Sequence, residues 1–444
     1  MNLSVDRRGF LKFAGIAGAA AALAACGGPS TSDDAGGAAA EIDYSGVQPA
    51  SEITWWSNNP GGSEAVSRQI IEAFHQENPD IRVNLVTAGS NYEEIAQRFQ
   101  TAQAGGTLPD LVVLSDVWWF RYYMQRSIVP MDPLISAVGI DTADYRQQLI
   151  EDYRYDGQLW ALPWARSTPL FYYNKAHWAA AGLPDRAPET WAEFGEWGPR
   201  LQAAGTGVQK AFQLPALADY AGWTFQNNLW GEGGAFSEDW TVTCDSPEAV
   251  RAIGFLADAV YTGGWAGVAG TESTTDLAAG AASATVGSTG SLVTILNAAD
   301  FELGAGFLPA GPVDGPVCPT GGAGLGIPAG IEPERQLAAA TFVKFLTSPE
   351  NAVLLSQATG YLPIRNSSDV SSLLAESPLR QVAIDQLEVT RTQDRARAFF
   401  PGADQEIART CANILNQRAD VQTELTALKG TLEGIYAADV EPNI

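Results

Sequence analysis

Polar side chains follow three predicted strands in the first 120 residues, at the point where each strand ends. Residues 57–59 (Ser-Asn-Asn), 89–92 (Gly-Ser-Asn-Tyr) and 115–116 (Ser-Asp) supply hydroxyls, carboxamides, a phenol and a carboxylate. These groups can donate and accept hydrogen bonds to a small polar molecule. Ligands of doubly wound α/β domains bind at the carboxyl ends of the strands, so the three segments predict a binding site.

The elements that would position these segments follow from hydrophobic periodicity. Residues 52–56 and 81–85 are typical of strands, and 110–114 form an apolar run after the first residue, as in a strand buried on both faces. Two amphipathic helices are expected between them, one from an N-cap at Ser63 to a stop at Pro79, the other over residues 92–104. The order strand, helix, strand, helix, strand predicts a doubly wound α/β lobe.

The second half of the chain is predicted to be more helical. Helices are expected at residues 247–262 and 341–354, and over most of the chain after residue 373. The roughly 390 residues from Glu52 onward are too many for a single core, which indicates two lobes. We interpret residues 159–164 and 169–175 as the place where the chain crosses from the first lobe to the second.

The sequence carries no recognisable catalytic apparatus. It has no Gly-x-Ser-x-Gly nucleophile elbow and no Gly-x-x-x-x-Gly-Lys phosphate loop, and its two histidines, His75 and His177, have no evident partner. Without a Cys-x-x-Cys pair a zinc site is not expected. A glycosidase carboxylate pair cannot be singled out among 51 acidic residues. We therefore expect a protein that is not an enzyme and uses no cofactor or metal.

The N-terminus predicts export and lipid anchoring. Arg7-Arg8-Gly9-Phe10-Leu11-Lys12 matches a twin-arginine signal, and residues 14–25 are apolar but too few to span a bilayer. Leu23-Ala24-Ala25-Cys26 reads as a lipobox, so residues 1–26 are expected to be a signal peptide ending at a lipidated Cys26. The alternative is an ordinary N-terminal membrane anchor. The Gly/Ser/Ala-rich residues 27–50 are expected to be a flexible tether.

The net charge bears on the kind of binding partner, and the cysteine count limits the number of disulfides. A net charge of −25 argues against a nucleic-acid partner. Once Cys26 is assigned to the lipid, Cys244, Cys318 and Cys411 remain, so at most one disulfide can form among them. At least one of these thiols is then expected to be buried and inert.

Several runs in a fixed order resemble a known family. The crossing segment resembles the extracellular solute-binding proteins of carbohydrate-type ABC transporters, through Trp164-Ala165-Arg166-Ser167-Thr168-Pro169-Leu170-Phe171-Tyr172-Tyr173-Asn174-Lys175, Ala181-Gly182-Leu183-Pro184 and Thr190-Trp191. Gly360-Tyr361-Leu362-Pro363-Ile364 resembles the glycerol-3-phosphate-binding branch. Three more runs resemble its actinobacterial glycerophosphocholine-binding lipoproteins: Trp118-Trp119-Phe120, Cys318-Pro319-Thr320-Gly321-Gly322-Ala323-Gly324-Leu325 and Arg391-Thr392-Gln393-Asp394-Arg395-Ala396-Arg397.

The resemblance implies a fold and a domain division. It implies an α/β, two-lobed periplasmic-binding-protein fold of type II, like maltose-binding protein, with a hinge and a ligand cleft between the lobes. We expect lobe 1 to comprise residues 51–165 plus about 305–355. Lobe 2 is expected to comprise residues 166–304 plus about 356–444.

The resemblance also implies the roles of eight residues. Tyr92 and Asp116 match positions that hold glycerol hydroxyls, and Arg397 matches the charge partner of a phosphodiester. The positions around the phosphodiester are matched by Ser167, Ser291, Gly322 and Tyr361, with Ser288 as an alternative to Ser291, and an aromatic wall by Trp223. Tyr220 occupies a position that varies in the family between large and small apolar residues, and its ring could join that of Trp223 in a wall for a quaternary ammonium. Arg395 stands where relatives have Tyr and could add positive charge beside Arg397.

These residue types suit such a ligand chemically. Arg397 offers a planar fork of donors to an anion, Asp116 accepts from hydroxyls, and ring faces such as that of Trp223 attract a quaternary ammonium. Each also has a structural explanation: Asp116 could cap a helix over residues 117–123, and Arg397 could form a surface ion pair. Trp223 and Tyr361 could simply be core residues.

The function expected from this resemblance is ligand capture for an ABC importer. The protein would bind a glycerophosphodiester, foremost glycerophosphocholine, and deliver it to the permease as a lipid-anchored monomer outside the cell membrane. Binding of an oligosaccharide or of glycerol 3-phosphate is the alternative within this class. An exported glycosidase or phosphodiesterase is the alternative outside it.

Overall fold

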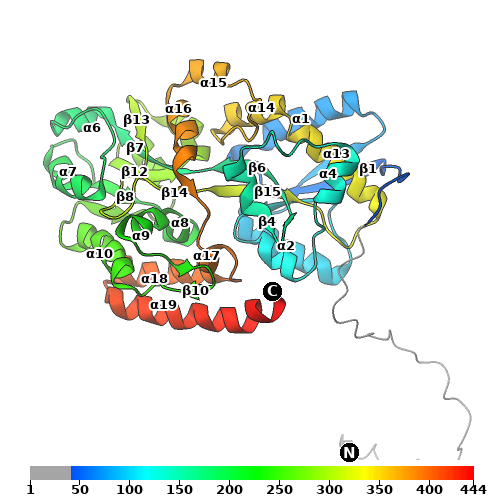
Figure 1. Cartoon of the computed structure of the whole chain (residues 1–444). Helices are drawn as coiled ribbons and strands as arrows, with labels where there is room; N and C mark the ends of the chain where they lie inside the picture. Colours follow the sequence, from blue (N-terminus) through cyan, green and yellow to red (C-terminus); the bar gives the residue numbers. More distant parts are fainter. Residues whose placement is uncertain (1–41) are drawn as a thin grey trace, which may run out of the picture. The chain divides into compact units, whose positions relative to one another are not determined.

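The computed structural model describes residues 42–444, so the predicted export signal, Cys26 and most of the predicted tether lie outside the described residues. The first of its two five-stranded sheets has the order β2-β1-β3-β15-β6. Figure 1 labels β1, β6 and β15 of this sheet. Its strands are β1 (Glu52–Ser57), β2 (Arg82–Thr87), β3 (Leu111–Ser115), β6 (Leu162–Ser167) and β15 (Gly321–Gly326). β1 is parallel to β2 and β3, whereas β15 runs antiparallel to both β3 and β6.

Helices connect the first three strands as the hydrophobic periodicity predicts. α1 (Glu64–Glu77) follows β1 and ends before Pro79, and α2 (Tyr92–Gly105) follows β2. The side chain of Asn91 caps α2 by accepting a hydrogen bond from the backbone N–H of Glu94, and Gly106 ends it in the left-handed conformation. The predicted strand–helix alternation at residues 52–115 is confirmed.

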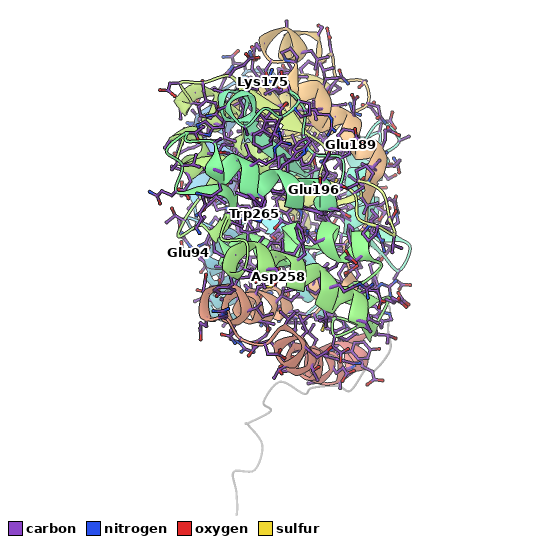
Figure 2. All side chains as sticks on the ribbon, turned by 90° about the vertical axis from the view of Figure 1, so that its left-hand side faces the viewer. Glu94, Lys175, Glu189, Glu196, Asp258 and Trp265 are labelled. Atoms are coloured by element: carbon purple, nitrogen blue, oxygen red, sulfur yellow. The ribbon has the colours of Figure 1, made fainter. Side chains whose placement is uncertain are left out.

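The second sheet has the strand order β11-β8-β12-β7-β13. These strands are β7 (Pro169–Asn174), β8 (Lys210–Leu214), β11 (Ala266–Val268), β12 (Ala282–Ser288) and β13 (Leu303–Gly306). An aromatic core that includes Phe171, Phe194 and Phe212 packs the sheet against α7 (Trp191–Ala203). Figure 2 looks onto α7 and α10 (Pro247–Tyr261), and it labels Glu196 of α7 and Asp258 of α10 on this side.

The chain passes from the first sheet to the second within one residue. β6 ends at Ser167 and β7 begins at Pro169, and these strands belong to different sheets. The predicted crossing segment therefore joins the two sheets. The chain returns to the first sheet between β13 and β15, and β14 (Cys318–Pro319) on this return path pairs with β16 (Thr390–Arg391).

The prediction of one helix over residues 341–354 is wrong. The segment contains the end of α13 (Pro333–Leu346) and the start of α14 (Pro349–Thr359). Ser348 caps α14 by accepting from the backbone N–H of Asn351, and Pro349 in its first turn has no N–H for a continuous helix. Farther on, α18 (Ala403–Gln417) and α19 (Val421–Ile435) lie within the C-terminal region that was predicted to be mostly helical.

The three cysteines at 244, 318 and 411 are free and buried. Burial raises the pKa of the Cys244 and Cys411 thiols to about 12, so neither is a reactive thiolate near neutral pH. Between residues 42 and 444, no helix has both the length and the apolarity that a membrane crossing requires.

Gly360 ends α14, and its substitution is expected to lower the free energy of unfolding measurably. Its φ is +101°, and a Cβ there would lie 2.5 Å from the carbonyl oxygen of Thr289. Gly402 has a φ of +81°, but a Cβ at that position would meet nothing within 4 Å. We expect Gly402→Ala to cost about 1–2 kcal/mol from backbone strain and Gly360→Ala about 2–5 kcal/mol because the clash adds to it. Equal losses in chemical unfolding of the two variants would contradict the packing at Gly360.

Candidate ligand-binding site

A cavity of about 440 Å³ lies where the carboxyl ends of β1, β2 and β3 meet residues of the second sheet and of the C-terminal helices. The three polar segments predicted at the strand ends all contribute to its lining, including Asn58, Asn91 and Asp116. All nine residues that the resemblance singled out also line it: Tyr92, Asp116, Ser167, Tyr220, Trp223, Ser291, Gly322, Tyr361 and Arg397. Ser288 lines the same cavity, so both candidate serines of that loop reach it.

The floor of the cavity is built by the register of three strands. Gly321 pairs with Ser167 and Gly322 with Arg166, and the N–H of Asp116 donates to the carbonyl of Gly322 at 3.1 Å. Gly322 has a φ of +96°, and a Cβ there would lie 2.2 Å from the carbonyl oxygen of Ala165. Only glycine fits this position, because any side chain would push β15 away from β6.

Two tyrosines form one wall of the cavity. The ring of Tyr361 packs so closely on Gly61 and Gly290 that a Cβ at either glycine would lie within 2.8 Å of it. Tyr361 interacts with Tyr92, and burial raises the pKa of Tyr361 to about 12 and that of Tyr92 above its usual range. Both phenols therefore stay protonated and can donate hydrogen bonds. Beside them, Oδ1 of Asn58 is buried without a hydrogen-bond partner.

A buried guanidinium, that of Arg397, lines the cavity. Arg397 is 4% exposed; its Nε donates to Oδ1 of Asp404 at 2.9 Å and its Nη1 contacts Oδ2 of Asp116 at 3.3 Å. Burial would lower the pKa of Arg397, but the carboxylates of Asp404 and Asp116 outweigh it and raise the pKa. Arg397 is thus not a surface ion-pair residue.

Asp116 does not serve as the cap of the helix that follows it. Oγ of Ser115 accepts from the N–H of Val117 at 3.3 Å and donates to Oδ1 of Asp116 at 2.9 Å. The carboxylate of Asp116 points instead toward Arg397 and Gln393. The capping explanation is therefore wrong, and Asp116 belongs to the charged network of the cavity.

An aromatic pair forms another part of the lining. Trp223 and Tyr220 lie on α8 (Leu217–Thr224) with ring centroids 6.2 Å apart. Trp223 is 5% exposed and its Nε1 donates to the carbonyl of Thr320 at 3.0 Å. The hydroxyl of Tyr220 donates to Oε2 of Glu272 at 3.4 Å. Trp223 is thus buried like a core residue and lines the cavity as well.

Arg395 does not add positive charge beside Arg397. Its guanidinium contacts Oδ1 of Asp239 at 2.8 Å and lies 4.4 Å from the ring centroid of Trp240. It lines a different cavity of about 590 Å³. The reason is local: α17 (Arg395–Ala398) is a single helical turn, and residues two apart on a helix point in different directions.

Sequence reasoning missed residues that support the site. Asp404, on α18, holds Nε of Arg397, and Gln393 contacts both Asp116 and Arg397. The only signal in the sequence is that Gln393 lies four residues before Arg397 in a run already singled out.

A second buried pair lies beneath the cavity floor. The guanidinium of Arg166 is fully buried, donates to the hydroxyl of Tyr153 at 3.0 Å and pairs with Asp152. Burial raises the pKa of the Asp152 carboxyl even though Arg166 opposes the shift. Within residues 42–444 no three metal-ligating side chains form a group that could hold a metal ion.

Comparisons with known proteins bear on what this cavity does. Residues 69–381 match the model of the bacterial extracellular solute-binding protein family. The sn-glycerol-3-phosphate-binding periplasmic protein UgpB of Escherichia coli strain K12 is 29% identical over 337 residues, covering 72% of this chain and 76% of that protein.

Two solved structures share the fold. UgpB from Mycobacterium tuberculosis in complex with glycerophosphocholine has a TM-score of 0.83 at 43% identity, covering 88% of this chain and 99% of that one. Maltose-bound MalE3 of T. maritima has a TM-score of 0.76 at 23% identity, covering 86% of this chain and 99% of that one, and bears on the fold alone. The predicted two-lobed, maltose-binding-protein-like α/β fold is confirmed.

The family match spans well over half of the chain and confirms the predicted class of function, so the enzyme alternative is excluded. The chain belongs to the bacterial extracellular solute-binding proteins and is the extracytoplasmic substrate-binding component of an ABC importer.

Proposed function

We propose that the protein binds glycerophosphocholine in the 440 Å³ cavity and delivers it to the permease of its importer. The observation that carries this proposal is the meeting, in one cavity, of the buried guanidinium of Arg397 with the aromatic pair Tyr220 and Trp223. The first suits a phosphodiester and the second suits a quaternary ammonium. The likeness to the glycerophosphocholine complex of UgpB supports the same ligand.

The polar groups of the cavity have two distinct proposed roles. Arg397, with the hydroxyls of Ser167 and Ser291 and the backbone at Gly322, would hold the phosphodiester. Tyr361 would also contact the phosphodiester, and Tyr92 and Asp116 would hold the glycerol hydroxyls. Asn58 adds a buried acceptor that lacks a partner, and ligand hydroxyls would satisfy it.

The charges of the cavity favour a zwitterion over a dianion. Among the described residues, its lining includes four carboxylates, those of Glu93, Asp116, Glu272 and Asp404, but a single guanidinium, that of Arg397. Such a lining disfavours glycerol 3-phosphate, which carries close to two negative charges near neutral pH. Glycerophosphocholine carries one negative and one positive charge, and each good ring contact with its cation contributes about 0.5–2 kcal/mol.

A ligand panel tests this order of preference. Glycerophosphocholine at about a thousand times its Kd is expected to add about 4 kcal/mol to the free energy of unfolding. Glycerol 3-phosphate should raise Tm less at equal concentration, and maltose should leave it unchanged. Differential scanning fluorimetry of the mature protein gives the ranking. Stabilisation by maltose but not by the diester would replace the proposed ligand with an oligosaccharide.

Three substitutions test which groups hold which end of the ligand. Arg397→Ala removes the proposed partner of the phosphate and should weaken glycerophosphocholine binding by about a hundredfold in calorimetry, because hydrogen bonds to a charged group contribute about 1.5–3 kcal/mol each. Arg395→Ala is the matched control, since this arginine is on the same turn but lines another cavity, and the Kd of this variant should stay within about twofold of the parent.

Trp223→Ala should weaken binding of the choline diester more than binding of glycerol 3-phosphate. Equal losses for the two ligands would show that Trp223 does not contact choline.

We also propose twin-arginine export and a lipid on Cys26, which the extracytoplasmic role of the family supports, and a monomeric state. Of the tether predicted over residues 27–50 we propose only the part before Tyr44, because the Tyr44 hydroxyl donates to Oε1 of Gln336 at 2.7 Å and the N–H of Ala50 donates to the carbonyl of Glu334 at 2.8 Å. The proposed lobes are residues 51–165 with about 305–355 and residues 166–304 with about 356–444, supported by the strands that each sheet contains.

The lipid anchor has its own test. Cys26→Ser should move the protein from the membrane fraction to the soluble extracytoplasmic fraction, because no acyl chain can then be attached. Fractionation of cells followed by immunoblotting measures the change. Unchanged membrane retention would favour an uncleaved N-terminal anchor.

A further inference from the structure

Gln393 contacts both charged groups of the ligand site without lining its cavity. Its side-chain Nε2 donates to Oδ2 of Asp116, and its Oε1 accepts from Nη1 of Arg397. Nη1 of Arg397 also contacts the same Oδ2 of Asp116, at 3.3 Å. The carboxamide therefore lies at the junction of the carboxylate and the guanidinium and bonds to each.

The backbone that carries Gln393 is fixed on both sides. Before it, β16 pairs with β14 on the return path to the first sheet. After it, the carboxylate of Asp394 accepts from Nε1 of Trp230 at 2.9 Å and from the N–H of Phe236 at 2.7 Å. The buried side chain of Gln226 accepts from the N–H of Asp394 at 2.9 Å and donates to Oε1 of Gln393 at 3.3 Å. These contacts fix the position of Gln393, so its side chain can orient Asp116 and Arg397.

A glutamine carboxamide can make both contacts, one to the carboxylate of Asp116 and one to the guanidinium of Arg397. Its N–H₂ donates to a carboxylate while its carbonyl accepts from a guanidinium, whereas an ionised glutamate cannot donate and lysine cannot accept. Without it, Asp116 and Arg397 could close into a two-point ion pair, the preferred geometry of arginine with a carboxylate. That pair would occupy the acceptor proposed for the glycerol hydroxyls and the donor proposed for the phosphate.

We propose that Gln393 is a positioning residue of the ligand site. Its amide holds the Asp116 carboxylate and the Arg397 guanidinium in place while keeping them from forming a closed pair, so that both face the ligand. This inference rests on the proposed function for its effect on ligand affinity. The bridge itself can be tested without any ligand.

The affinity test uses Gln393→Glu, which keeps the shape and the acceptor but replaces the donor with a second carboxylate against Asp116. The affinity for glycerophosphocholine near neutral pH should fall about tenfold to a hundredfold. The matched control is Gln381→Glu on α16 (Leu379–Asp385), where an exposed glutamine donates to Oδ1 of Asp385 at 2.6 Å. The affinity of this control should stay within about twofold of the parent.

The pH dependence separates positioning from a general structural defect. Two facing carboxylates raise each other's pKa, so the loss should be full above that raised pKa and should shrink as the pH falls through it, when a bound proton restores a donor. The ratio of the Kd of Gln393→Glu to that of the parent, measured from about pH 5 to about pH 8, reports this change. A ratio that does not change with pH would overturn the inference.

Other charged groups around this junction are common to the parent and the variant. They are Asp404 on α18, Asp394 and Arg395 on the same segment as Gln393, and Asp152, Arg154 and Glu151 at an adjoining cavity. Because these groups are present in both proteins, the ratio of the two Kd values isolates the carboxylate that the substitution adds.

A swap of the two groups provides the ligand-free test. The double variant Asp116→Asn with Gln393→Glu exchanges amide and carboxylate and restores a donor opposite an acceptor. Its Tm should recover most of the loss seen in Gln393→Glu alone, and a double variant that simply adds the two single losses would overturn the bridge. If the parent does not bind glycerophosphocholine, the proposed function fails while the swap still decides the bridge. If the parent binds and both Gln393 tests are negative, only this inference fails.

Discussion

The ligand site depends on keeping one buried positive charge paired. A guanidinium as buried as that of Arg397 is costly to take out of water unless carboxylates and hydrogen bonds surround it. Asp404 holds its Nε and Asp116 lies against its Nη1, and these two residues come from the C-terminal helices and from the end of β3. Asp404 lies only seven residues from Arg397, whereas Asp116 lies 281 positions away, so the second contact joins the end of β3 to the C-terminal helices at the cavity.

Beneath this pair, a second buried pair stiffens the cavity floor. Arg166 and Asp152 lie under the strand register that brings Ser167 beside β15. Asp152 also accepts a hydrogen bond from the hydroxyl of Thr320, whose carbonyl accepts from Trp223. The cavity floor and the aromatic residue Trp223 are therefore joined through Thr320.

Hydrophobic periodicity was sufficient for the parts of the fold whose order is local. The strands and helices up to residue 115 follow the periodicity because their apolar faces, caps and stops lie within each element. Periodicity failed at Pro349, where an apolar helical pattern continues across a cap and hides the break between α13 and α14. It also could not orient Arg395, because the direction of a side chain on a one-turn helix depends on what packs around it.

What the sequence by itself determined is the class of protein and most of the residues that line the cavity, since strand ends, short motifs and residue chemistry are properties of neighbouring positions. The tertiary structure alone decided which charges meet: Asp116 faces Arg397 rather than a helix end, Asp404 completes the pair, and Gln393 lies at their junction. The physical reason is that electrostatic and hydrogen-bond partners are chosen by distance in space. Gln393 and Arg397 contact Asp116 although they lie 277 and 281 positions from it along the chain.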